Sequence, residues 1–396
     1  MKIAIVILGT RGDVQPMVAL AKGLTGNGHD VVICAPPENE QLVVTNNCRF
    51  IKFGPEIKKQ INENPQKQKG GVAVKISPKQ GKKLIGDQIN ILPELIKPVD
   101  LVLATGIVMG VQTAADILKV PYRLVAFYPI LLGTTPEDPL KNRMMFAFGR
   151  KMINLFIRGF INKNRAKYQL PPIKDAWHHW LGDNVIMACD RELVEARKEV
   201  AFSFTQTAYM ILPSKNQLPD GVENFINSGK PPVYIGFGSN PITGPEKYGQ
   251  IFIEVQQTTQ QRLIVSKGWA NLPENNNENI LYVDDMPFEL LFPRLVAVVY
   301  HGGTGTMSAV ARAGVPHAAF PFMGDQFMNR DQIVKLNLGP KTCNFKKIST
   351  RAISNAIMEC INNETYKKNA VEMAQKLKNV NGVELTVNLI EKEFGR

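Results

Sequence analysis

Apolar residues in this chain alternate between short continuous runs and longer stretches spaced as in a helix. In the first half, the runs predict five strands: Ile3–Leu8, Asp30–Ala35, Cys48–Phe53, Val99–Ala104 and Tyr122–Phe127. Stretches with helical spacing, such as Val14–Thr25 and Val108–Leu118, lie between them. Strands that alternate with helices predict a parallel sheet of βαβ units, and strands that are apolar throughout are typical of a sheet covered on both faces.

The second half of the chain repeats this pattern. Its apolar runs predict strands over Val233–Phe237, Arg262–Lys267, Ile280–Val283, Val296–Tyr300 and Ala318–Phe322. Helices are expected over Pro245–Thr259, Thr306–Ala313 and Asp325–Leu336, and a last helical stretch follows them. The predicted fold class is therefore α/β, with two Rossmann-like, doubly wound parallel-sheet domains that face a cleft and bind ligands at the carboxyl ends of their strands.

Proline and turn residues mark the boundary between the halves. Pro213, Pro219, Pro231 and Pro232 fall in one segment, which we interpret as a linker, so we place the boundary near residue 213. A length of 396 residues fits two domains. Hydrophobic residues make up 44% of the chain and charged residues 21%, which argues against a disordered, collagen-like or coiled-coil protein.

Neither a membrane span nor a secretion signal is expected. No apolar run reaches the length that crosses a bilayer, and the first residues lack a signal-peptide core and cleavage site. The five cysteines have no metal-ligand or disulfide-framework spacing. We therefore expect reduced thiols and a cytoplasmic location.

The net charge of +12 lies mostly in the first half, which holds 28 Lys/Arg against 18 Asp/Glu. Residues 54–86 are rich in Lys, Gln and Asn and predict a loop over the mouth of the cleft or a solvated insertion. Residues 140–166 are both apolar and basic. They predict a core-facing helix with a solvated basic face, or else a surface helix in peripheral contact with an anionic membrane. No nucleic-acid-binding motif is present, so nucleic acid is not an expected partner.

The strongest candidate for chemistry is the Gly-rich turn between Tyr300 and Thr306. It joins an apolar run to a helical stretch, so its backbone N–H groups and the helix dipole offer a site for an anion. Gly303 and Gly305 let the backbone approach a diphosphate closely. Thr306 adds a hydroxyl donor and His301 adds a ring N–H. We call residues 300–306 the phosphate turn.

Two further turns follow predicted strands of the same half. Asp325 and Gln326 stand side by side about 20 residues after the phosphate turn, where a carboxylate and an amide can hold adjacent sugar hydroxyls. The alternative for Asp325 is a helix cap. Ser239, in the turn after the strand that begins at Val233, offers a hydroxyl to a phosphate, unless this is an ordinary Gly-rich turn.

In the first half, a polar turn directly follows the first predicted strand. Its sequence, GTRGDVQP from Gly9 to Pro16, is not the GxGxxG fingerprint of dinucleotide-binding proteins. It places Asp13 at the mouth of the expected cleft, where a carboxylate can act as general base for an acceptor hydroxyl. The alternative is that Asp13 caps the helix.

Together these motifs resemble those of inverting glycosyltransferases of the GT-B fold, in the large UDP-glycosyltransferase family. The resemblance is greatest to the branch of sterol glucosyltransferases and glycopeptide aglycone glycosyltransferases. It covers nearly the whole chain and rests on segments that occur in the family's order: GTRGDVQP, CAPPE, LPPI, PPVYIGFGSN, HGGTGT, RAGVP and PFMGDQ.

The resemblance implies a domain plan and a set of site residues. Residues 1–212 form an acceptor-binding domain, residues 213–380 a nucleotide-sugar-binding domain, and residues 381–396 a C-terminal helix that packs back on the first domain. Asp13 is the implied catalytic base, in place of the histidine of many relatives. The implied donor-binding residues are Thr10, Arg11, Gly12, Ser239, Met286, His301, Gly303, Gly305, Thr306, Asp325 and Gln326.

The implied reaction transfers a hexose, with glucose as the first choice, from a nucleotide sugar to a hydroxyl of a small lipophilic acceptor such as a sterol, terpenoid, polyketide or other aglycone. No metal and no cofactor is expected. UDP and TDP both stay open, because the segment VDDMPFE lacks the aromatic residue that many relatives stack on uracil. The alternatives are a nucleotide-sugar epimerase or hydrolase on the same fold, and a non-catalytic donor-binding partner of another transferase.

Overall fold

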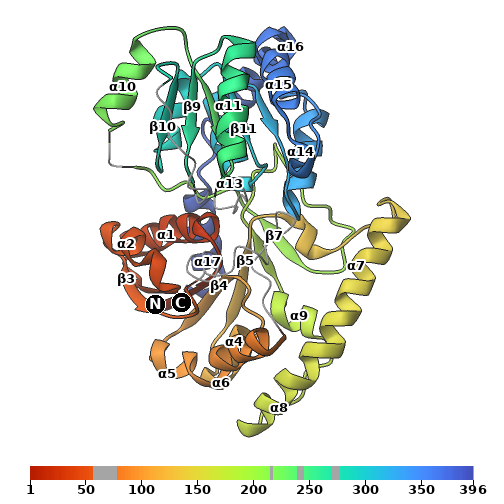
Figure 1. Ribbon diagram of the computed structural model, residues 1–396. Coiled ribbons are helices and arrows are strands. Elements are labelled where there is room, and N and C mark those ends of the chain that lie inside the picture. Colours follow the sequence, from red (N-terminus) through yellow and green to blue (C-terminus); the bar gives the residue numbers. More distant parts are fainter. Residues whose placement is uncertain (57–77, 215–216, 239–244, 269–276, 396) are drawn as a thin grey trace.

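The computed structural model describes residues 1–56, 78–214, 217–238, 245–268 and 277–395. These residues form two α/β domains, each built on a parallel sheet that is covered by helices on both faces (Figure 1). This arrangement confirms the fold class that the apolar pattern predicts.

The first domain has a seven-stranded sheet in the order β3-β2-β1-β4-β5-β6-β7, with every pair parallel. Its strands are β1 (Lys2–Leu8), β2 (Asp30–Ala35), β3 (Arg49–Lys52), β4 (Leu101–Gly106), β5 (Tyr122–Ala126), β6 (Val185–Met187) and β7 (Phe204–Gln206). Alternate side chains of β1 enter the two cores on opposite faces of the sheet, with Ile5 in one and Val6 in the other. This explains why β1 is apolar at nearly every position.

Helices cover both faces of this sheet. They are α1 (Arg11–Gly26), α2 (Glu40–Thr45), α4 (Pro78–Asn90), α5 (Leu92–Ile96), α6 (Val111–Leu118), α7 (Leu140–Ile153), α8 (Gly159–Lys167) and α9 (Ala176–Leu181), with the short turns η1 (Pro37–Asn39) and η3 (Pro129–Leu132). A π-helical turn, η4 (Asn154–Arg158), joins α7 to α8. Buried residues of α1 pack on one face of the sheet, and those of α6 pack on the other.

The second domain has a five-stranded parallel sheet in the order β10-β9-β8-β11-β12. Its strands are β8 (Val233–Gly236), β9 (Leu263–Ser266), β10 (Ile280–Val283), β11 (Ala297–Tyr300) and β12 (His317–Ala319). Its helices are α10 (Asp220–Asn227), α11 (Pro245–Thr259), α12 (Phe288–Leu291), α13 (Thr304–Ala313), α14 (Asp325–Lys335), α15 (Thr350–Asn362) and α16 (Glu364–Leu377), with the turns η5 (Phe292–Arg294) and η6 (Phe345–Lys347). Helices α13 and α16 contribute to one core, and α11 and α15 to the other.

The last helix, α17 (Gly382–Phe394), leaves the second domain and packs on α1 of the first. Its buried residues Val387 and Ile390 belong to the same core as α1. Polar contacts fix its outer side: Glu391 accepts from Asn27 at 3.0 Å and lies 3.0 Å from His29 Nε2. The chain therefore crosses between the domains twice.

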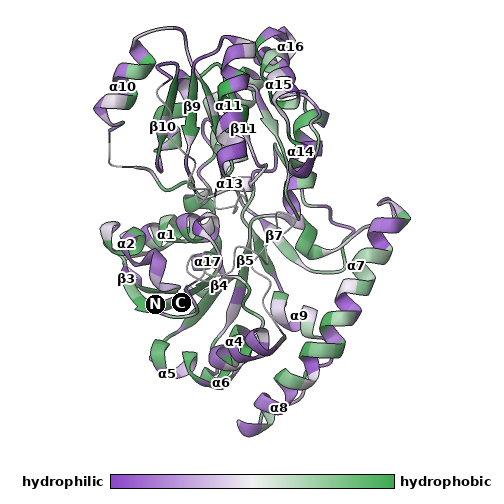
Figure 2. Cartoon of the chain, in the orientation of Figure 1, coloured by the Kyte–Doolittle hydropathy of each residue, from purple (hydrophilic) through white to green (hydrophobic). Residues whose placement is uncertain are grey.

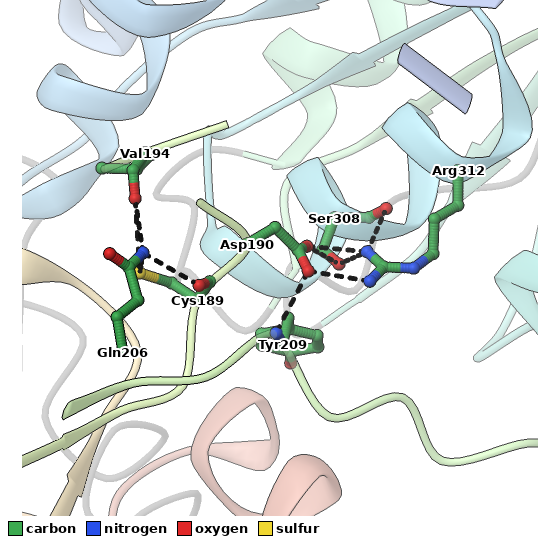
Figure 3. Close-up of polar contacts among 7 residues, drawn as sticks. All are labelled: Cys189, Asp190, Val194, Gln206, Tyr209, Ser308 and Arg312. Atoms are coloured by element: carbon green, nitrogen blue, oxygen red, sulfur yellow. Dashed lines mark hydrogen bonds and ion pairs between the residues drawn. The ribbon is translucent and has the colours of Figure 1, made fainter. Parts of the chain in front are cut away.

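A buried polar cluster holds the two domains together (Figure 3). Asp190, which follows β6, accepts two hydrogen bonds of 2.7 Å from the guanidinium group of Arg312 on α13. It also accepts from the Ser308 hydroxyl at 2.7 Å and from the Tyr209 backbone N–H at 3.2 Å. The Asp190 side chain is only 1% exposed and that of Arg312 is 16% exposed, so this pair is a buried, bidentate ion pair.

A glutamine from the sheet supports the loop that carries this carboxylate. The side-chain amide of Gln206, at the end of β7, donates to the carbonyl of Cys189 at 3.1 Å and to that of Val194 at 2.9 Å (Figure 3). These bonds fix the backbone on both sides of Asp190.

Several predicted elements need correction. Residues 78–86 of the expected loop over 54–86 belong to α4, and residues 57–77 lie outside the described part of the chain. The expected linker contains the helix α10, whose Val222 and Ile226 are buried against the second domain. The division of the chain at residues 213 and 381 stays a prediction.

The segment 140–166 also differs from the favoured expectation. It is a helix, but no residue of α7 is buried, so α7 does not face the core. Burial begins only in α8, with Ile161, Asn164 and Arg165. No helix formed by the described residues combines the length and the apolar character needed to cross a bilayer.

Candidate active site

The turns that the sequence singles out come together where the two sheets face each other. Thr10 and Arg11 lie after β1, where α1 begins, and the loops after β10 and β11 carry Asp285 and His301. An ion pair joins the two domains here: Arg11 Nη1 lies 2.7 Å from Asp285 Oδ2. As in other open α/β sheets, the site is therefore formed at the carboxyl ends of parallel strands.

Asp13 lies in the first turn of α1, with its carboxylate folded back over the preceding loop. Its Oδ2 accepts the Thr10 N–H at 2.8 Å and lies 3.4 Å from the Thr10 hydroxyl. Thr10 is the N-cap, and the two residues form a capping box. A Cβ on Gly9 would lie 2.1 Å from Asp13 Oδ2, so only glycine leaves room for the carboxylate. Asp13 therefore takes part in capping α1 from the third helical position, although the N-cap itself is Thr10.

The environment of Asp13 favours its protonated form. Burial raises the pKa of the Asp13 carboxyl above its ordinary value, and the two hydrogen bonds from Thr10 partly oppose this rise. A higher pKa makes a carboxylate a stronger base, which suits a group that must remove a proton from a hydroxyl.

His301 stands at the end of β11 between two glycines. A Cβ on Gly303 would lie 2.4 Å from His301 Nε2, and one on Gly238 would lie 2.9 Å from its Cε1. Burial lowers the pKa of His301 to about 4, against an opposing contribution from the backbone at Gly236. The imidazole is therefore neutral near pH 7, when one ring nitrogen carries a proton that it can donate.

Helix α13 begins at Thr304, three residues after this histidine, with Gly303 as its N-cap and no side-chain cap. The N–H groups of its first turn have no partner within the helix and point toward the site, at the positive end of the helix dipole. Thr306 lies in this turn, and a Cβ on Gly305 would lie 2.5 Å from the Tyr209 hydroxyl. This end of α13 can bind an anion.

Asp325 and Gln326 begin α14, beside the phosphate turn. The Thr304 hydroxyl donates to Asp325 Oδ2 at 3.3 Å. Gln326 Oε1 accepts the backbone N–H groups of Phe322 at 2.8 Å and Met323 at 3.2 Å, which leaves the amide nitrogen as the group free to donate. The adjacent carboxylate and amide thus lie at the site, with the amide oxygen already occupied.

Carboxylates from the two domains influence each other across the site. Burial raises the pKa of Asp325 to about 6, and the charge of Asp13 adds to this rise. Both carboxylates also raise the pKa of Tyr128, although burial is the larger cause. Tyr128 comes shortly after β5, and the influence of both carboxylates on its hydroxyl indicates that it lies near both acids. Sequence spacing alone did not identify it as a site residue, because the proximity arises from the fold.

The remaining candidates have less defined surroundings. Gly12 is exposed beside Thr10, and Met286 is half-buried against the core of the second domain. Arg11 is occupied by Asp285 in this structure, and Asp284 lies 3.5 Å from Lys267. Ser239 lies outside the described residues. No group of three or more metal-ligating side chains gathers anywhere in the described ranges.

Other histidines have structural surroundings. His179 is buried, with Nε2 2.8 Å from the Thr113 hydroxyl, and burial lowers its pKa to about 3. His317 is buried with its Nδ1 3.0 Å from the Val315 carbonyl. His178 is exposed. None of the three lies on the turns that form the site.

Comparisons with known proteins agree with this geometry. A family model described as "UDP-glucoronosyl and UDP-glucosyl transferase" matches residues 202–391. A second, described as "Glycosyltransferase family 28 N-terminal domain", matches residues 3–92. The two matches fall in the two halves that the sequence pattern distinguishes.

Individual relatives match over most of the chain. A sterol 3-beta-glucosyltransferase of Arabidopsis thaliana is 31% identical, and the match covers 100% of this chain and 68% of that protein. The vancomycin aglycone glucosyltransferase of Amycolatopsis orientalis is 27% identical, covering 86% and 85%. The crystal structure of the glycotransferase of kitacinnamycin superposes with a TM-score of 0.73 at 17% identity, covering 99% of this chain and 98% of that one. This last likeness confirms the GT-B fold.

Proposed function

Because the chain belongs to the UDP-glycosyltransferase family and is a hexosyltransferase, we propose that it transfers glucose, with inversion, from a nucleotide sugar to a hydroxyl of a small lipophilic acceptor. The observation that carries this proposal is the proximity of Asp13 in one domain to Asp325 in the other, where Asp325 lies beside the Gly-rich turn that carries His301. A proton acceptor, an anion site and a pair of sugar-binding groups then face one bound substrate.

In the proposed reaction, Asp13 accepts the proton of the acceptor hydroxyl while the hydroxyl oxygen forms a bond to the anomeric carbon. The bond from that carbon to the diphosphate oxygen breaks, and its electron pair leaves with the nucleoside diphosphate. The first turn of α13 and the neutral His301 stabilise the charge on the leaving group. Stabilisation by N–H groups supports our proposal that the reaction needs neither a metal nor another cofactor.

Donor recognition is shared among the other candidates. We propose that Gly303, Gly305, Thr306 and Ser239 contact the diphosphate, that Asp325 and Gln326 hold the sugar, and that backbone near Met286 contacts the base. Thr10, Arg11 and Gly12 approach the donor from the first domain. UDP-glucose is the donor that we favour, with a TDP-sugar as the alternative.

The acceptor class is supported by the relatives, whose names specify a sterol and the vancomycin aglycone. We propose a lipophilic alcohol of the sterol or natural-product type. We also propose that the chain acts in the cytoplasm and reaches such acceptors by peripheral contact with a membrane through residues 140–166.

A thermal-shift titration tests the donor site. UDP, TDP, GDP and their glucose conjugates are added to wild type, to His301→Ala and to the control His178→Ala, which changes an exposed histidine. A ligand that binds only the folded state raises the melting temperature. We expect UDP or UDP-glucose to stabilise wild type and the control but not His301→Ala. Equal shifts in all three proteins would contradict the proposed site.

An acceptor screen with the stabilising donor tests the transfer. Sterols and polyphenolic aglycones are incubated with that donor, and products are identified by mass spectrometry. A hexose adduct of an acceptor supports the proposal. Release of free glucose or an epimerised donor in every reaction, without an adduct, would instead support a hydrolase or epimerase, and donor binding without any turnover would support a non-catalytic partner.

A further inference from the structure

A long helix on the first domain exposes a row of large apolar side chains. We call residues 140–167 the projecting helix; it comprises α7, η4 and α8 and lies along the outer edge of the domain (Figure 1). Its exposed apolar residues are each between 57% and 68% exposed: Leu140, Met144, Met145, Phe148, Leu155 and Phe156. Figure 2 shows hydrophobic and hydrophilic residues alternating along this helix. Several large apolar side chains exposed on one helix, with basic residues among them, indicate a candidate interaction site.

The orientation of the helix is fixed by its inner side. Arg150 Nε donates to Asp175 at 2.9 Å, and Asn154 Oδ1 accepts the backbone N–H of Ala176 at 2.7 Å. Phe146 packs edge-on against Trp177, with ring centroids 5.3 Å apart. Because these contacts hold one face against the domain, the helix cannot rotate to bury its apolar row without breaking them.

A basic groove runs beside this helix. It has a volume of about 740 Å³ and lies between the helix and the segment 134–136. Five of its lining side chains are cationic: Arg143, Arg150, Lys151, Arg158 and Lys174. No acidic residue lines it, and among the described residues only Arg150 of these five forms an ion pair with a carboxylate. The groove is therefore a concentrated site for anions.

We infer that the apolar row and the basic groove together dock the protein on an anionic phospholipid bilayer. Apolar side chains enter the boundary between headgroups and acyl chains, and the groove binds lipid phosphates. A helix that exposes Phe, Leu and Met side chains next to Lys and Arg is typical of such interfacial contact. A second copy of this chain is disfavoured as the occupant, because the projecting helix carries eight Lys/Arg and no acid and would repel itself.

This docking surface connects to the proposed acceptor side of the site. Residues 134–136, which form one wall of the groove, follow shortly after η3. The turn η3 in turn begins directly after Tyr128, which lies near Asp13. A lipophilic acceptor dissolved in the bilayer would thus meet the enzyme beside the base. The docking surface deepens the membrane contact proposed above for residues 140–166, and this last step also rests on the proposed acceptor class.

Sedimentation with vesicles tests the inference. Full-length protein is mixed with vesicles of phosphatidylcholine alone, or of phosphatidylcholine with 30% phosphatidylglycerol. Two double variants remove the two components: Phe148→Asp with Leu155→Asp, and Arg143→Glu with Lys151→Glu. Val371→Asp and Lys368→Glu on α16 are the matched controls, since Val371 is 54% exposed and the Lys368 side chain is 77% exposed.

We expect wild type and both controls to bind the anionic vesicles and to dissociate as salt is added. Each basic residue near the surface contributes about 1 kcal/mol, so loss of the two positive charges alone weakens partitioning roughly 30-fold, and the two added negative charges weaken it further. The apolar double variant should also lose binding. Both double variants should keep the donor-induced thermal shift of wild type, which separates failure of docking from failure of the donor site.

Several results would overturn the inference. Wild type could fail to sediment with anionic vesicles, or either double variant could bind as wild type does. Inorganic phosphate could block binding while the apolar variant binds normally, which would assign the groove to a soluble anion. Sedimentation velocity could show a dimer that the apolar variant abolishes in the absence of lipid, which would assign the apolar row to a second copy.

Discussion

The buried ion pair between the domains provides a quantitative test of the structure. In Arg312→Met, the apolar part of the side chain is kept but both hydrogen bonds to Asp190 are lost. The carboxylate, whose side chain is 1% exposed, would then keep only the Ser308 hydroxyl and the Tyr209 N–H as donors. A buried charge without its counterion is among the largest single causes of instability.

The expected magnitude follows from this burial. Removing one partner of a buried pair lowers the free energy of unfolding by about 3–5 kcal/mol. For domains of this size, that corresponds to a fall in melting temperature of roughly 6–20 °C. The control is Arg49→Met, because the pair between Arg49 and Asp30 is 67% and 49% exposed and contributes roughly 0–1 kcal/mol.

Urea unfolding measures the loss of stability, and donor titration measures the effect on the KM for the donor. Arg312→Met should unfold at lower urea than Arg49→Met, and its KM for the donor should rise, since α13 carries the phosphate turn. The double variant Asp190→Leu with Arg312→Met should recover much of the lost stability, because no buried charge is left unpaired. The reasoning is refuted if Arg312→Met is as stable as Arg49→Met, or if the double variant is as unstable as the single one.

Three further predictions concern the site. Asp13→Asn should lower kcat by roughly 10²–10⁴-fold and leave the donor-induced thermal shift intact, because an amide oxygen can still accept the Thr10 N–H; normal turnover would exclude Asp13 as the base. The raised pKa of Asp325, about 6 against an ordinary 3.8, means that its charge is disfavoured in the folded state. Wild-type stability should therefore fall as pH rises from about 4 to 6. Melting temperatures of Asp325→Asn, measured over the same pH range, should lack the part of this fall that Asp325 causes. The variant should also bind the sugar of the donor more weakly. Gly303→Ala should displace the His301 ring and raise the donor KM, whereas Gly221→Ala, where an added Cβ meets nothing within 4 Å, should not; equal donor KM values would refute the steric argument.

Local signals in the sequence predicted much of the fold. Helix α11 was predicted with its observed ends, Pro245 and Thr259, because a proline at the first helical position and regular apolar spacing act within the segment. Strands β6 and β7 were missed, since each has only three residues and is defined by pairing with a distant neighbour. Helix α10 was hidden by the prolines around it.

The site shows the same distinction. Motifs within one turn, such as His301 with its glycines, could be recognised from spacing alone. The contact between Asp190 and Arg312 joins residues 122 positions apart, and Tyr128 approaches Asp13 and Asp325 only in the folded chain. Neither has a local pattern, so only the three-dimensional arrangement reveals them. For residues 140–166 the sequence left a core-facing helix and a surface helix open, and the favoured core-facing helix was wrong for α7, because apolar spacing does not say whether a face meets the core or solvent.

The return of α17 to the first domain has a consequence for protein engineering. Chimeras that exchange substrate specificity are most simply made by joining one enzyme's first half to another's second half. Here such a hybrid would place a foreign α17 on α1, where Val387 and Ile390 fill a core shared with Met17 and Leu20, and where Gly23 leaves space for Val383. A functional hybrid should therefore take residues 382–394 from the parent that supplies residues 1–206, so that the exchangeable unit is an internal segment of the chain with two junctions.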